Sequence, residues 1–147
     1  MNRLPQVVVS IIAGAALVYA GFYLTGIGAA NTSPKELGLT AGAVFALLML
    51  FAWGLPAFIL WSFAGFVIQR RHLHFALLGA ATEILILFSF SLLPAATNAS
   101  LQAELGALAS ALVWPVAFIA VLSPLGSLLG AKVRVLLSAA PGSRGSP

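Results

Sequence analysis

Four long apolar segments, separated by short polar ones, constrain the fold of this chain more than any other feature. They cover about residues 5–30, 38–69, 73–93 and 105–129. Each has at least the roughly 20 residues that a helix needs to cross a hydrocarbon core about 30 Å thick. Because hydrocarbon offers the backbone no hydrogen-bond partner, such segments are expected to be helical. The sequence therefore predicts an all-α fold, an integral membrane four-helix bundle.

The bundle is expected to form a single domain over residues 1–140, followed by a disordered tail over residues 141–147. Beyond residue 129, two possibilities remain for the segment up to about residue 140. It either continues the fourth helix or forms a helix that lies in the membrane interface. A cleaved signal peptide is the alternative for the first segment, although its apolar stretch exceeds the roughly 7–15 residues typical of such a peptide.

Prolines predict where the helices bend or end. A proline lacks the N–H group that a helix uses and clashes with the carbonyl group four residues earlier. We therefore expect bends at Pro56 in the second segment and at Pro115 and Pro124 in the fourth, and the end of the third helix at Pro94. The bent helices either line a site, as broken helices do in transporters, or are tolerated without a function.

Composition excludes several classes of protein. With 61% hydrophobic and 7% charged residues, the chain cannot be a soluble globular protein, which carries about 25% charged residues. It has no cysteine and no phosphate-binding loop, nucleophile–base pair or paired carboxylates, so we expect neither enzymatic activity nor a cofactor. His72 and His74 are two residues apart and face different directions on a helix, so we expect them near lipid headgroups and predict no metal site.

Glu83 is the strongest candidate for a functional residue. It is the single carboxylate of the third segment and lies twelve residues after Arg71, about 18 Å along a helix, in the middle of the hydrocarbon. An ionisable group at that depth is costly and predicts a functional site with a partner. Ala76, Gly79 and Ala80 share its helix face, so we expect this face to pack against another helix.

The partner of Glu83 is predicted from depth. Tyr19 and the carbonyl group of Ala120, which Pro124 leaves without a helical donor, lie at a comparable depth in straight helices. No Lys or Arg lies there, so the carboxyl group is expected to be neutral much of the time. Two roles remain open, namely a proton or substrate site and a protonated group that only fixes helix packing.

Small residues in the first segment predict a second packing surface. Gly14, Gly21 and Gly28 recur every seven residues and form a seam where another helix can approach closely. Tyr19 and Tyr23 are four residues apart and share a face. Tyr23 is expected near the outer interface and Tyr19 deeper, where its hydroxyl group needs a partner.

Basic residues predict the orientation. Six of the seven Lys and Arg residues fall on one side of a four-span topology, so both termini are expected to be cytoplasmic. Four of them, which we also expect to bind anionic lipid, are Arg70, Arg71, Lys132 and Arg134. The Ala-, Leu-, Gly- and Val-rich composition favours a multi-pass protein of the bacterial cytoplasmic (inner) membrane, and we expect no nucleic-acid partner.

Two functions are consistent with these features. The first is an accessory or structural subunit of a larger membrane assembly, which packs through its small-residue surfaces. The second is a homo-oligomeric small transporter or channel that uses Glu83 as a proton or cation-substrate site. In size and in having one membrane glutamate the chain is similar to the small multidrug resistance exporters. Their glutamate is in the first helix and this one is in the third, so no residue roles carry over.

Overall fold

The structure, a computed structural model, describes residues 4–31, 40–68, 71–97 and 105–139. These residues form α1 (Leu4–Asn31), α3 (Ala41–Met49), the π-helix η1 (Leu50–Gly54), α4 (Leu55–Val67), α5 (His72–Thr97) and α6 (Leu105–Ala139). α3, η1 and α4 follow one another without a break. The described part of the chain thus contains four helices that are long and apolar enough to cross a membrane.

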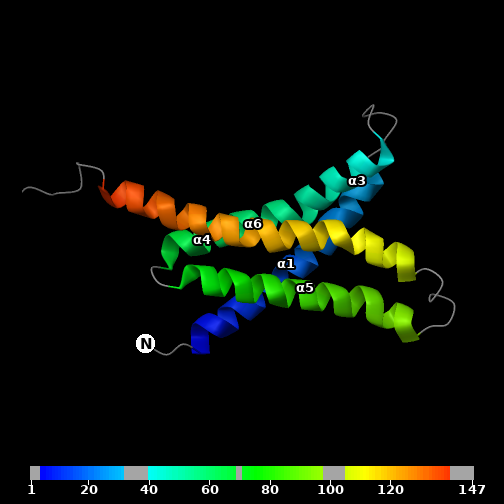
Figure 1. Ribbon diagram of the computed structural model, residues 1–147, viewed down its shortest axis with the longest axis horizontal. Coiled ribbons are helices and arrows are strands. Elements are labelled where there is room, and N and C mark those ends of the chain that lie inside the picture. Colours follow the sequence, from blue (N-terminus) through cyan, green and yellow to red (C-terminus); the bar gives the residue numbers. More distant parts are fainter. Residues whose placement is uncertain (1–3, 32–39, 69–70, 98–104, 140–147) are drawn as a thin grey trace, which may run out of the picture.

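The helices form a bundle that opens toward one end. α6 packs against α4 and α5, and α1 packs against α5. Figure 1 shows that α1 crosses α5 at a steep angle, and that α3 and the C-terminal half of α1 diverge from α5 and α6 on the right of the view.

The second membrane-length helix shows how the chain accommodates a proline. It begins at Ala41, after Thr40, whose hydroxyl oxygen accepts a bond from the N–H of Ala43 at 3.3 Å. The π-helix η1 ends two residues before Pro56, and the N–H of Leu55 bonds to the carbonyl group of Leu50, five residues earlier. This wider turn gives room near the proline ring, so the bend predicted at Pro56 takes the form of a π-helical turn.

The other prolines do not interrupt their helices. α6 runs over 35 residues and contains both Pro115 and Pro124. The segment after residue 129 therefore extends α6, and is not a separate helix in the interface. The predicted end of the third helix at Pro94 is wrong, since α5 continues to Thr97. A helix near its end loses little from one missing N–H donor, and membrane helices commonly tolerate proline.

The three glycines of the predicted seam all lie against other helices. A Cβ atom added to Gly14 would lie 2.6 Å from the carbonyl oxygen of Gly79 in α5, and one added to Gly21 would lie 2.6 Å from the ring of Trp53. At Gly28 it would collide with a leucine side chain of α3. The seam thus brings α1 close to α5, η1 and α3 in turn.

A further glycine surface holds α4 and α6 together. Cβ atoms added to Gly65 or Gly130 would collide with the carbonyl oxygens of Ser127 and Ser62, and Gly126 is equally crowded. Gly126 and Gly130 are four residues apart, the spacing that lets membrane helices approach closely. They are missing from the packing residues predicted above, although this spacing is visible in the sequence.

Candidate functional site around Glu83

Glu83 lies entirely inside the bundle. Its exposed fraction is 0%, and Ala76, Gly79 and Ala80 on the same face of α5 are also buried. The prediction that Glu83 faces protein is therefore confirmed. The strip of small residues is what allows two other helices to cover this face of α5.

α1 and α4 close the site from two directions. A Cβ atom added to Gly14 of α1 would lie 3.3 Å from the Cβ atom of Thr82 and 3.4 Å from the backbone nitrogen of Glu83. The indole ring of Trp61, in α4, lies against Gly79, one helical turn before Glu83, so closely that a Cβ atom there would collide with it. Glu83 is thus enclosed by a glycine contact and a buried tryptophan.

Several buried polar atoms of the bundle have unused hydrogen-bonding capacity. Among the described residues, no hydrogen-bond partner exists for either carboxyl oxygen of Glu83, for Nε1 of Trp61 or for Oγ of Ser123, and all three side chains are buried. The N–H of Trp53, in contrast, donates to Oγ1 of Thr25 at 3.1 Å. An unpaired buried polar group typically costs about 1–3 kcal/mol.

The surroundings of Glu83 favour a neutral, protonated carboxyl group. An ionised carboxylate without a counter-ion would be far more costly in this environment than the protonated form. A protonated carboxyl group can both donate and accept hydrogen bonds, and the indole N–H can only donate. The arrangement can therefore hold a proton or bind a small polar group. Trp61 and Ser123 are not among the residues predicted above, because a tryptophan or serine within an apolar run gives no signal of an unpaired atom.

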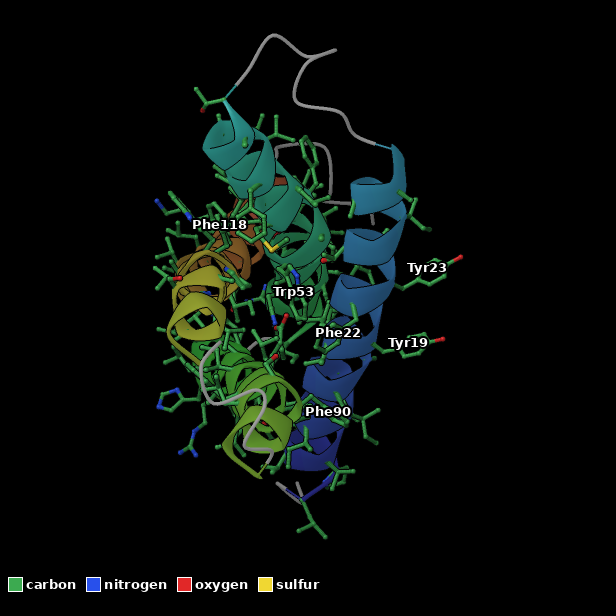
Figure 2. All side chains as sticks on the ribbon, turned by 90° about the vertical axis from the view of Figure 1, so that its right-hand side faces the viewer. Tyr19, Phe22, Tyr23, Trp53, Phe90 and Phe118 are labelled. Atoms are coloured by element: carbon green, nitrogen blue, oxygen red, sulfur yellow. The ribbon has the colours of Figure 1, made fainter. Side chains whose placement is uncertain are left out.

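The predicted hydrogen bond between Tyr19 and Glu83 is wrong. Tyr19 is 77% exposed, and Figure 2 shows its side chain pointing away from the bundle, as does that of Tyr23. Although Tyr19 was expected at the same depth as Glu83, it lies about 140° around the helix from Gly14, which faces α5. Its side chain is therefore on the opposite side of α1. The carbonyl group of Ala120 does not bond to Glu83 either.

His72 and His74 have different surroundings in the structure. Nδ1 of His72 lies 2.8 Å from Oγ of Ser127, so this side chain links the start of α5 to α6 instead of meeting lipid headgroups as predicted. His74 is exposed. The side chains do not converge on one point, as their spacing predicts.

Three of the four predicted lipid-facing cations lie in the described part of the chain. Arg71 directly precedes α5, and Lys132 and Arg134 lie near the end of α6. Because His72, Lys132 and Arg134 line one cavity, the beginning of α5 and the end of α6 are at the same end of the bundle. Arg70 lies outside the described residues.

The membrane-length helices define the class of the protein, a multi-pass membrane protein with a carboxyl group buried between its helices. No protein family, curated protein or solved structure matches the chain. Two features of the structure bear on its function, namely the enclosure of Glu83 and the chemistry of the outward helix faces.

Proposed function

We propose that the protein is an accessory or structural subunit of a larger membrane assembly, and that α1 is the helix that contacts the partner. The observation that carries the proposal is the position of two tyrosines. Tyr19 and Tyr23 are 77% and 62% exposed and lie on the outward face of α1 (Figure 2).

The depth of Tyr19 makes its exposure informative. It lies fifteen residues after Leu4 and twelve before Asn31, about 22 Å and 18 Å from the two ends of α1. Its hydroxyl group bonds to no residue that the structure describes. Hydrocarbon cannot satisfy a hydroxyl group, whereas a neighbouring helix can.

The rest of this surface suits close contact between helices. Ala15, Ala16 and Gly26 lie within about 60° of Tyr19 around the helix and are exposed, and together with Tyr19 and Tyr23 they form what we call the tyrosine face. A Cβ atom added to Gly26 would have no atom within 4 Å. Small residues beside hydrogen-bonding side chains are typical of membrane helix interfaces.

Co-purification tests this proposal. The tagged protein, extracted in mild detergent, is expected to retain a fixed set of other membrane proteins, and Tyr19→Ala with Tyr23→Ala is expected to lose most of them. Ile59→Ala with Phe63→Ala, a pair on α4 with the same spacing and similar exposure, is the control and should retain them. Retention by both variants, or recovery of this chain alone, would contradict the proposal.

The second candidate is a homo-oligomeric transporter or channel, and Glu83 is the observation that favours it. A fully buried carboxyl group with two unpaired oxygens is the kind of group that binds and releases a proton. Glu83→Gln keeps the size of the side chain but cannot carry a proton through the cycle. In proteoliposomes this candidate predicts that Glu83→Gln abolishes proton-coupled flux while Glu104→Gln preserves it. Flux that survives Glu83→Gln would exclude the proton role.

For the location we propose the bacterial cytoplasmic (inner) membrane, with both termini in the cytoplasm. The cations at the start of α5 and the end of α6 lie at one end of the bundle, and such residues favour the cytoplasmic side. The Ala- and Leu-rich composition, with Arg as the main cation, supports a bacterial membrane.

A further inference from the structure

A groove at the cationic end of the bundle combines apolar side chains with two cations. It has a volume of about 830 Å³ and is formed by three helices. Phe58 of α4 and His72 of α5 form one wall, and α6 forms the other. The residues of α6 that matter most here are Leu125, Leu129, Lys132 and Arg134. We call this the basic groove.

The groove is lined mainly by apolar residues and contains two cations. Leucine and phenylalanine provide half of its lining residues, Val135 and Leu136 continue it past the cations, and no acidic residue lines it. Lys132 is exposed and makes no ion pair with a described residue. Arg134 donates from Nη1 to the carbonyl oxygen of Phe66 at 3.2 Å, which holds its guanidinium group beside the end of α4.

The two cations of the groove follow a long uncharged stretch of α6. Residues 105–131 carry no charge and span about 40 Å as a helix, more than a hydrocarbon core of about 30 Å. Lys132 and Arg134 therefore lie at the level of the headgroups, and Leu125 and Leu129 lie within the acyl chains. His72 is fixed at the wall by its contact with Ser127.

We infer that the basic groove binds one anionic phospholipid, with its phosphate group beside Lys132 and Arg134 and an acyl chain along Leu125 and Leu129 against Phe58. Basic pockets between membrane helices favour anionic headgroups. The charge of the rim selects against a zwitterionic lipid, and the apolar length of the groove selects against a free phosphate. The inference is independent of the proposed function, because the groove does not include Glu83 or the tyrosine face.

Lipid binding is best measured by native mass spectrometry of the full chain with added phosphatidylglycerol or phosphatidylcholine. We expect phosphatidylglycerol to bind with one-to-one stoichiometry and more tightly than phosphatidylcholine. Lys132→Gln with Arg134→Gln should weaken phosphatidylglycerol binding on the order of tenfold or more. Arg71→Gln removes a described cation that does not line the groove and should leave the affinity within about twofold.

A second variant tests the shape of the groove independently of its charge. Ala131→Trp keeps both cations and fills the groove, which Ala131 also lines, so it should lose phosphatidylglycerol binding as well. This variant also tests the inference if the charge variant does not insert into the membrane. Equal weakening by Arg71→Gln and by the groove charge variant would overturn the inference, as would full displacement of the lipid by inorganic phosphate at equal concentration.

Discussion

Glu83 is enclosed by small residues and not by hydrogen bonds. Gly14 and Gly79 let α1 and Trp61 come close enough to shield the carboxyl group from the outside of the bundle. None of these residues gives the carboxyl group a hydrogen-bond donor or acceptor. The carboxyl group of Glu83 is thus buried because its neighbours Gly14 and Gly79 have no side chains to hold the other helices away.

This enclosure predicts the effect of removing the carboxyl group. Glu83→Met replaces an unpaired polar group with an apolar one of similar length, and the energetic penalty of the unpaired group disappears. We expect the free energy of unfolding in detergent to stay equal or rise by about 1 kcal/mol, measured by circular dichroism during denaturation. A loss of several kcal/mol would show that the carboxyl group has a partner in the protein.

The sequence indicated what Glu83 faces but not what touches it. The small residues at three, four and seven positions before it place protein on its side of α5, and this is what the structure has. Tyr19 was predicted as its partner from depth alone, and depth contains no information on the direction of a side chain. The direction depends on which face of α1 carries the glycine seam, and Gly14 and Gly21 both lie far around the helix from Tyr19.

At the scale of helices, glycine positions set the distances between elements. The seam on α1 could be predicted from its period, because a regular period marks one face of a helix. The glycine contacts of α4 and α6 follow the same logic. The π-helical turn before Pro56 could not be predicted, since a proline in a helix is accommodated by a kink, a bulge or a wider turn according to what packs around it.

Paired substitutions in α1 test the packing of this element. Gly14→Ala places a methyl group against the carbonyl oxygen of Gly79, so α1 and α5 must move apart. We expect a loss of about 1–3 kcal/mol in the free energy of unfolding, measured by denaturation in detergent.

Gly26→Ala is the matched control, because a methyl group there meets no atom within 4 Å. A helical Gly→Ala change at an open position is expected to stabilise by about 0.5–1 kcal/mol. If both variants lost the same stability, α1 would not pack against α5 through Gly14.

The two candidate functions differ in what they require of a single copy of the chain. A single copy already buries Glu83 completely, so the carboxyl group needs no second copy to leave the lipid. The exposed tyrosines of α1 are not needed to enclose Glu83, so they remain available to a partner.

Cross-linking inside the native membrane distinguishes a protein partner at α1 from lipid. A photoreactive benzophenone side chain is introduced at position 19, and in a separate variant at position 63, which is similarly exposed on α4. We predict that position 19 forms an adduct of fixed mass with one other membrane protein and that position 63 does not. Adducts of position 19 with lipid only, or with a second copy of this chain, would contradict the assignment of the protein as a subunit that docks through α1.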